Sequence, residues 1–391
     1  MFARRTSWRL TENRYAAALS AARRSSAKLF DLTASNPTHC DINFASAAIL
    51  SSLSHAESLN YEPDPQGLRS ARKAVADYYK ASHVRGNASI ISPEQIFLTT
   101  STSEGYSYLF RLLCDPGDEV LVPRPSYPLF EFLADIQDVQ LRGYELFYDH
   151  GWHVDIGGLQ EAITARTRAV LVVNPNNPTG SFVHSSELRQ LVLSCSERNL
   201  ALISDEVFLD YEVEHKAEIS AAFSSECLSF ALSGLSKISC LPQMKLAWIV
   251  VNGPAELREQ AHARLQVIAD TYLSVNAPIQ NALPELLKQR DHLQPQLTQR
   301  IRANLEFLDG ELKSVASTQR LKVEGGWYCV LRIPAKRLDE DLAIELIERS
   351  RVLVYPGHFY DFQSDGYLVV SLITPENEFR NGVASILEIA G

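Results

Sequence analysis

The sequence predicts an α/β protein: a mostly parallel sheet sandwiched by helices, with a smaller α+β domain formed by the N- and C-terminal segments. Between residues 95 and 251, short runs of Val, Ile and Leu alternate with segments of helical period. These runs are apolar without interruption, which is typical of strands buried on both faces. A long helical pattern replaces the alternation after residue 255. Together these observations favour a sheet with helices on both faces and a second, mixed domain.

The first part of the chain is expected to be mostly helical. Residues 11–28 place arginines beside an Ala/Leu face, and residues 68–80 carry apolar side chains at helical period. Between them, the apolar segment 30–34 ends in the turn signal Ser-Asn-Pro-Thr. A Pro- and Gly-containing loop at 61–67 precedes the second helix.

The central part predicts the sheet and its covering helices. Short Val/Ile/Leu runs indicate strands at 95–100, 119–123, 169–173, 200–205, 227–232 and 246–251. Amphipathic segments indicate helices at 103–114, 129–135 and 185–198.

The C-terminal part predicts the second domain. Helical patterns run from 255 to 312, and this long segment is expected to connect the two domains. Segment 321–333, a helix at 339–349, and a strand pair around Val352 and 367–372 follow. We therefore divide the chain into an N-terminal arm and helix of the small domain at 1–45, a large domain at 46–285 and a small C-terminal domain at 286–391.

Composition excludes several classes of protein. The 391 residues are 46% apolar and 21% charged, as in an ordinary globular protein, and their number allows two domains. A net charge of −10 argues against nucleic-acid binding, because a phosphate backbone selects clustered Lys and Arg. No apolar run approaches the ~20 residues of a membrane span. The expected partners are therefore small molecules.

The cysteines point to the cytoplasm. The six of them contain no CxxC and no metal-ligand spacing, so we expect reduced core thiols and no metal site. The first 30 residues are rich in Arg and Ser and poor in acids, a composition shared with transit peptides. Because their helical pattern joins the folded body directly, we interpret them as a helix of the protein.

Lys237 is the first candidate for chemistry. It lies in Ser233-Gly234-Leu235-Ser236-Lys237, between two apolar strand-like runs, where a lysine has no packing role. Desolvation there would lower its pKa and allow the amine to attack a carbonyl carbon.

Three further stretches accompany it: Asp115-Pro116-Gly117-Asp118-Glu119-Val120, Asn174-Pro175-Asn176-Asn177-Pro178-Thr179-Gly180 and Ser204-Asp205-Glu206-Val207-Phe208. With the Lys237 stretch, their order and rough spacing resemble those of the fold-type I, pyridoxal-phosphate-dependent aminotransferases of class I/II. The resemblance extends from about Leu32 to near the C-terminus. It implies a pyridoxal 5′-phosphate cofactor, an amino donor and an oxo-acid acceptor as substrates, and a homodimer with a shared active site.

The resemblance assigns roles around the cofactor ring. Lys237 matches the Schiff-base lysine, whose freed amine moves a proton during transfer through a pyridoxamine form. Asp205 ends a predicted strand, where a buried carboxylate needs a cationic partner such as a pyridinium N–H; a helix N-cap is the alternative role. Asn177 matches the donor to the phenolic oxygen and a substrate-carboxylate ligand, and Tyr127 matches the ring-stacking aromatic.

The phosphate group is expected at Ser101, Thr102 and Ser103. These hydroxyls lie between a strand and a helix, and free N–H groups at a helix N-terminus bind anions. Ser236 and Lys245 would complete the site, although most relatives carry a bidentate arginine at the latter position. Tyr61 matches a tyrosine that reaches the phosphate from the neighbouring subunit.

The substrate is expected to contact Ser35, Asn36 and Asn177, but two departures from the family pattern affect the chemistry. Phe208 stands where many relatives have a tyrosine that donates to the phenolic oxygen. The absence of this hydroxyl should raise the pKa of the Schiff base between lysine and cofactor, while cofactor binding should remain. Val369, in Gly366-Tyr367-Leu368-Val369-Val370-Ser371, occupies the place of the family's carboxylate-binding arginine. Another cation, for which Arg332 and Arg124 are candidates, binds that carboxylate, or the substrate lacks it.

Three functions are consistent with these residues. An aminotransferase is the leading hypothesis. A carbon–sulfur lyase or decarboxylase would use the same cofactor and differ in which substrate bond breaks. A catalytically silent relative is the third, but it would be expected to lose Lys237 or Asp205, and both are present.

Overall fold

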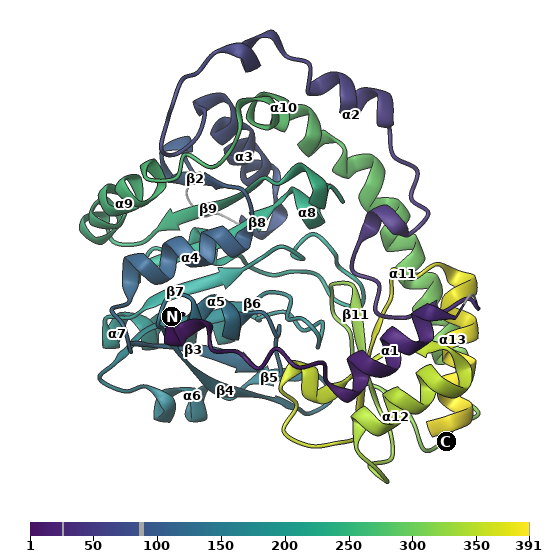
Figure 1. Ribbon diagram of the computed structural model, residues 1–391. Helices are drawn as coiled ribbons and strands as arrows, with labels where there is room; N and C mark the ends of the chain where they lie inside the picture. The colour runs from purple at the N-terminus through teal and green to yellow at the C-terminus, as the bar shows by residue number, and fades with distance from the viewer. Residues whose placement is uncertain (26, 86–89, 391) are drawn as a thin grey trace.

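A large sheet of eight strands forms the centre of the molecule (Figure 1). The structure, a computed structural model, describes residues 1–25, 27–85 and 90–390. In spatial order the strands are β2 (Ile96–Thr99), β9 (Ala247–Asn252), β8 (Ser229–Gly234), β7 (Ala201–Asp205), β6 (Thr167–Val173), β3 (Glu119–Arg124), β4 (Gln140–Tyr148) and β5 (Trp152–Val154). Strand β9 is antiparallel to both neighbours and β5 is antiparallel to β4, whereas the other pairs are parallel. The expected mostly parallel sheet is confirmed.

Helices cover both faces of this sheet. Alternate strand residues such as Leu202 and Ile203 belong to different apolar clusters, so each strand is buried on both sides. One face packs on α4 (Thr102–Leu113), α5 (Phe130–Asp135) and α9 (Ala255–Asp270). The other face packs on α3 (Arg69–Ala81), α7 (Ser185–Arg198), α8 (Leu235–Ile238) and α10 (Ala277–Lys288). Helix α2 (Ser46–Ser52) packs on α10, and α6 (Ile156–Ala162) packs on β4 and α7.

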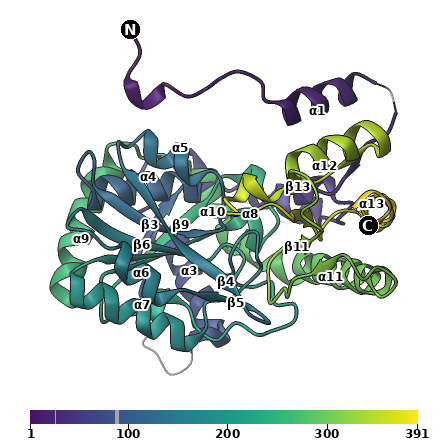
Figure 2. The same cartoon turned by 90° about the horizontal axis from the view of Figure 1, so that it is seen from below.

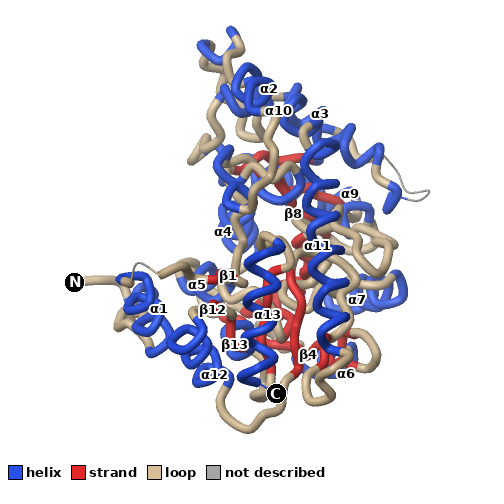
Figure 3. The backbone as a smooth tube through the Cα atoms, turned by 90° about the vertical axis from the view of Figure 1, so that its right-hand side faces the viewer, coloured by secondary structure: helices blue, strands red, loops and turns tan. Residues whose placement is uncertain are grey.

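The chain ends build a smaller α+β unit beside the large sheet (Figure 2). It contains the antiparallel sheet β10 (Gln319–Arg320), β11 (Tyr328–Arg332), β14 (Tyr367–Ser371) and β13 (Tyr355–Pro356), and the parallel pair β1 (Phe30–Asp31) and β12 (Val352–Leu353). Its helices are α1 (Arg14–Arg24), α11 (Arg290–Leu312), α12 (Asp339–Glu345) and α13 (Glu376–Ala390). Helix α1 packs against α12, and α11 lies beside α13 (Figure 3). No helix among the described residues combines the length and apolar character needed to cross a membrane.

Some expectations about elements were wrong. The segment around Val352 does not pair with 367–372: β12 pairs with β1, because the N-terminal segment returns to the small domain, and β14 pairs with β11 and β13. The stretch with Lys237, for which the sequence suggested only a connection between two strands, forms the short helix α8, because the backbone turns directly after β8. Strand β4 was missed because it alternates polar and apolar residues and is partly exposed.

Candidate active site

Five strands bring predicted site residues to one edge of the large sheet. Strands β3, β6, β7 and β8 are parallel, and β2 has the same direction because β9 is antiparallel to both β2 and β8. Their carboxyl ends therefore lie at the same edge, which is where open α/β sheets bind ligands. The segments that follow these five ends carry Ser101, Tyr127, Asn177, Asp205 and Lys237.

Lys237 projects into an aromatic pocket. Its Nζ lies 5.3 Å from the centre of the Phe208 ring and 4.6 Å from that of the Trp327 ring, and it donates to the Ser35 carbonyl oxygen at 3.3 Å. Burial lowers the pKa of the Lys237 amine to about 8, and nearby acidic groups, Asp205 among them, only partly oppose this effect. The amine is therefore held much closer to its neutral, nucleophilic form than a solvated lysine.

Asp205 is a buried carboxyl at the end of β7. It accepts hydrogen bonds from Tyr106 Oη at 2.7 Å and from the Val207 backbone N–H at 3.2 Å. Burial raises its pKa, while these two hydrogen bonds and the Lys237 charge lower it. The alternative role as a helix N-cap does not apply, because a turn and not a helix follows Asp205 at residues 207–210. Such a carboxylate is stabilised by any cationic N–H donor brought to it.

Asn177 and Tyr127 border the same region. The Asn177 side chain is buried, and its Oδ1 has no hydrogen-bond partner among the described residues. Tyr127 is 40% exposed and meets Phe130 edge-to-face, so one ring surface is available to a ligand. Burial, followed by the Asp205 charge, raises the pKa of the Tyr127 hydroxyl.

The residues predicted to bind the phosphate lie where β2 and β9 meet. Ser101 caps α4 by accepting from the Glu104 N–H at 3.2 Å, and Thr102 and Ser103 form the first turn of the helix. In register, Thr99 lies opposite Ala247, which in turn lies opposite the end of β8. Lys245 enters β9 two residues before Ala247 and is exposed. Ser101, Thr102, Ser103, Ser236 and Lys245 therefore follow or precede the ends of three neighbouring strands, β2, β8 and β9.

Of Ser35, Asn36 and Phe208, only Ser35 and Phe208 contact Lys237. Ser35 reaches Lys237 through its carbonyl, whereas the Asn36 side chain accepts from the Thr38 N–H at 3.1 Å and caps a turn. Phe208 is buried against Trp327, with ring centres 5.2 Å apart, so its position has no hydroxyl to donate.

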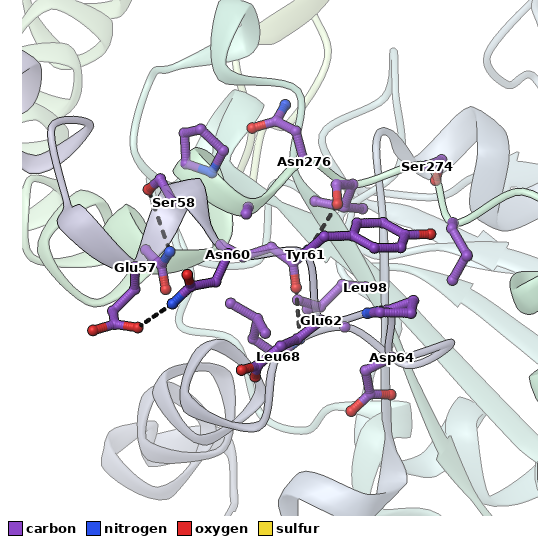
Figure 4. A pocket seen from close by; sticks show the side chains of 18 of the residues that line it. Glu57, Ser58, Asn60, Tyr61, Glu62, Asp64, Leu68, Leu98, Ser274 and Asn276 are labelled. Atoms are coloured by element: carbon purple, nitrogen blue, oxygen red, sulfur yellow. Dashed lines mark hydrogen bonds between the residues drawn. The ribbon is translucent and has the colours of Figure 1, made fainter.

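Tyr61 is not brought to the other residues within one chain. It is 82% exposed and lines a cavity of about 520 Å³ between segments 57–68 and 273–281 (Figure 4). Of the residues predicted for the site, it alone lines this cavity. Exposure of so large an aromatic ring marks a surface that a partner can cover.

Val369 lies in the middle of the small sheet. It is opposite Tyr355 and Val330 in the antiparallel pairs, and directly opposite residues share a face. The two arginines proposed to bind the substrate carboxylate in place of the family's arginine both have partners already. Arg332 donates to Gln319 at 2.6 Å on the outer strand, and Arg124, which lines a cavity with Tyr127, lies 3.1 Å from an Asp361 carboxylate oxygen.

Several residues of the site gave no signal in the sequence. Tyr106 holds Asp205, Tyr211 Oη donates to the Lys237 carbonyl oxygen at 2.7 Å, and Trp327 forms a wall beside the Lys237 amine. Tyr106 belongs to α4, which covers the large sheet, and Trp327 lies in the small unit. Only the tertiary structure brings them together.

The residues present fit pyridoxal phosphate. A buried carboxylate offers a partner for a protonated ring nitrogen, a buried amide with an unbonded oxygen lies at the same edge, and an amine of lowered pKa faces an aromatic pocket. Hydroxyls at a helix start and an exposed lysine suit a phosphate. An electron-poor ring with an aldehyde and a phosphate matches this set of donors and acceptors.

Fold and site together define an α/β protein with a lysine of lowered pKa at the carboxyl edge of its sheet. The family model for aminotransferase class I and II matches residues 27–386, and the chain belongs to this family. It is therefore a pyridoxal-phosphate-dependent aminotransferase, and the expected family, fold, cofactor and type of enzyme are confirmed.

Individual relatives agree with this assignment. The chain is 24% identical to a glutamate–pyruvate aminotransferase of Haemophilus influenzae over 92% of this chain and 90% of that protein. It is 28% identical to an alanine aminotransferase of Mycobacterium tuberculosis over 78% and 72%. Among solved structures, the alanine aminotransferase of Pyrococcus furiosus superimposes with a TM-score of 0.88 at 22% identity, covering 99% of both chains, which shows the common fold.

Proposed function

We propose that amino transfer between an amino acid or amine and a 2-oxo acid takes place at the edge of the sheet where Lys237 and Asp205 meet. The observation that carries this proposal is the Lys237 amine itself, which has a pKa of about 8 and lies in an aromatic pocket near a buried carboxylate. Such an amine can form a covalent bond with an aldehyde and later act as a base.

The chain's own residues would hold the cofactor at its two ends. Asp205, kept in place by Tyr106, would pair with the ring nitrogen, and Asn177 would donate to the phenolic oxygen. Tyr127 would cover one face of the ring. The phosphate would be bound by a separate set of groups: Ser101, Thr102, Ser103, Ser236 and Lys245. When bound, pyridoxal phosphate supplies an aldehyde that exchanges amines and a ring that withdraws electrons from the substrate.

Lys237 would then move a proton. Once a substrate amine takes its place, about half of the freed Nζ groups are neutral at a pH near 8, and the neutral form can remove the proton from the substrate α-carbon. Its pocket of Phe208 and Trp327 keeps the amine from hydration, and the Ser35 carbonyl gives it a resting hydrogen bond. Tyr211 fixes the backbone of the same residue.

We infer that the substrate's carboxylate contributes less to binding here than it would if an arginine were paired with it. The face of the small sheet that carries Val369 also carries Tyr355, and Arg124 is already paired with Asp361. A charge-assisted hydrogen bond contributes about 1.5–3 kcal/mol, roughly 10- to 150-fold in binding. Without one, an amine donor should react with a kcat/KM within about tenfold of that of the corresponding amino acid.

A homodimer with a shared site is part of the proposal. Two exposed leucines, Leu59 and Leu273, line the same cavity as Tyr61. A second copy of the chain would cover this surface and bring Tyr61 toward a phosphate group of its partner. Six unpaired cysteines support a reducing compartment, and we propose the cytoplasm.

Purified protein tests the proposal directly. Borohydride reduction of the cofactor-loaded protein, followed by peptide mass analysis, is expected to place the cofactor on Lys237. Glutamate, with and without its α-carboxylate, is then tested as donor with pyruvate as acceptor, because a relative is named for this pair. Alanine, with and without its α-carboxylate, is tested with 2-oxoglutarate as acceptor, because alanine and pyruvate would only be converted into each other. Labelling of another lysine would overturn the role of Lys237. A strict requirement for the carboxylate would overturn only the inference about Val369.

A further inference from the structure

Two histidines and a glutamate form a cluster on the surface of the large domain. His184, His215 and Glu218 offer three ligand atoms that all lie within 4.8 Å of one another. His184 stands directly before α7, whereas the other two belong to the segment between β7 and β8. All three side chains are partly exposed, at 22%, 38% and 38%, so an ion in solution can reach them.

The separations match those of ligands around one metal ion. Glu218 Oε1 lies 3.4 Å from His184 Nδ1 and 3.2 Å from His215 Nε2. Zinc bonds of ~2.0 Å to imidazole nitrogen and carboxylate oxygen, arranged tetrahedrally, place neighbouring ligand atoms roughly 3.3 Å apart. The two measured distances therefore require little movement of the side chains on binding.

A buried carboxylate orients the first histidine. His184 Nε2 faces Glu324 Oε2 at 3.4 Å, and Glu324 is only 3% exposed. A proton on Nε2 directed at this carboxylate leaves Nδ1 unprotonated and directed at Glu218. A metal-binding histidine whose second nitrogen donates to a carboxylate is the usual arrangement around zinc.

Glu218 is held in place and charged. Its Oε2 accepts from the Ser185 N–H at 2.9 Å, which leaves Oε1 for a ligand. A glutamate carboxylate is charged at neutral pH, so this oxygen can bind a cation.

We propose that His184 Nδ1, His215 Nε2 and Glu218 Oε1 bind one Zn²⁺, with water in the remaining position. Two imidazoles and a carboxylate are a borderline set that suits zinc better than calcium or magnesium.

The site would connect two segments that carry the active site. His184 ends the loop that begins at Asn174 and contains Asn177, and the Asn174 amide donates to the Ile219 carbonyl oxygen at 3.3 Å. Glu218 belongs to the segment that continues to Ser220, whose hydroxyl donates to Glu206 beside Asp205. An ion bound only by the folded chain stabilises these connections by mass action.

The test uses the dialysed, cofactor-loaded protein and Zn²⁺ alone. Calorimetric titration at pH 7.5 is expected to show one zinc per chain, and Co²⁺ in its place should give the absorption of a tetrahedral site. His215→Ala should remove this equivalent, and its melting temperature should no longer rise with zinc. Glu324→Gln should weaken binding about 10- to 100-fold while keeping the ligands.

His150→Ala is the matched control. His150 is a fully exposed histidine beside one carboxylate, Asp149, and it does not belong to the cluster of His184, His215 and Glu218. It should bind zinc like the parent. Circular dichroism of His215→Ala shows whether that variant folds. If the folded His215→Ala protein binds zinc as the parent does, or if the parent binds none, the assignment is wrong.

Discussion

The Lys237 amine lies beside the adjoining rings of Phe208 and Trp327, and its burial there controls its protonation. Burial lowers the pKa of the amine to about 8, whereas a solvated lysine has a pKa near ~10.4. The Asp205 charge opposes the shift but does not cancel it. We therefore propose that burial prepares Lys237 as the nucleophile and that the neighbouring carboxylate binds the cofactor.

The rate of cofactor capture by the cofactor-free protein should show this pKa. Below pH 8 the neutral amine, which is the reacting form, falls about tenfold per pH unit, so the rate should rise with pH and level off above about 8. Stopped-flow absorbance measures it. The same cofactor reacting with Nα-acetyl-lysine is the control, because it reports the cofactor's own titration and a free amine. A plateau only above pH 10 would contradict the burial of Lys237.

Tyr106→Phe tests the support of Asp205. The variant loses the 2.7 Å hydrogen bond that lowers the carboxyl pKa, so the pKa should rise and the acid limb of the pH–activity profile should move upward. Cofactor affinity should fall roughly tenfold, the value of a hydrogen bond to a charged group. Tyr144→Phe, which loses a buried hydroxyl that donates to the Leu171 carbonyl oxygen, is the matched control. Equal profiles for the two variants would refute the role of Tyr106.

At the scale of elements, the β8–β9 pair places the Lys237 helix. Strand β8 ends at Gly234, and α8 begins at the next residue. A Cβ on Gly234 would lie 2.7 Å from Ala247 Cβ and 2.9 Å from Ala247 Cα, in the neighbouring strand. The strands approach this closely because glycine has no side chain, and the approach brings Lys245 near the start of α8.

Gly234→Ala should therefore push the two strands apart. Overpacking of this kind lowers the free energy of unfolding by about 1–3 kcal/mol, and cofactor affinity should fall with it. Gly310→Ala in α11 is the control: a Cβ there would meet no other described atom within 4 Å, and the variant should be about 0.5–1 kcal/mol more stable. Urea unfolding with fluorescence titration of the cofactor measures both. Parent-like behaviour of Gly234→Ala would show that the strand contact adapts.

At the scale of the whole molecule, α11 carries the chain from the large sheet to the small unit. Helix α10 ends at Lys288 and α11 begins at Arg290, so we propose that the domain boundary falls at this break and not at residue 285, inside α10. The N-terminal segment to residue 45 contributes α1 and β1 to the small unit. Trp327 reaches Lys237 from that unit, so the active site is completed by both.

The proposed shared site predicts complementation between two inactive chains. Lys237→Ala and Tyr61→Ala chains, mixed after unfolding and refolded together, should form heterodimers with one intact site, giving about a quarter of parent activity in a two-fold symmetric dimer. Each variant refolded alone is the control, and sedimentation confirms that each forms dimers. Activity equal to the mean of the separate variants would show that Tyr61 does not act across the interface.

Local patterns were sufficient for most of the large domain. Apolar runs at 169–173 and 200–205 and the helix at 185–198 lie where expected, because period and burial are written in consecutive residues. The family motifs likewise located Lys237, Asp205, Asn177 and Ser101, since each follows directly on a strand end.

Other features depended on contacts between distant segments. The pairing of β12 with β1 joins residues more than 300 positions apart, and the hydrogen bond of Tyr106 to Asp205 crosses from a covering helix to a strand. Sequence by itself determined the fold class and the family, and it singled out Lys237 as the proposed nucleophile, because these depend on local period and on short motifs. Tertiary structure alone decided the lysine's aromatic pocket, the support of the carboxylate and the cluster of His184, His215 and Glu218, because packing brings their parts together and no spacing along the chain encodes them.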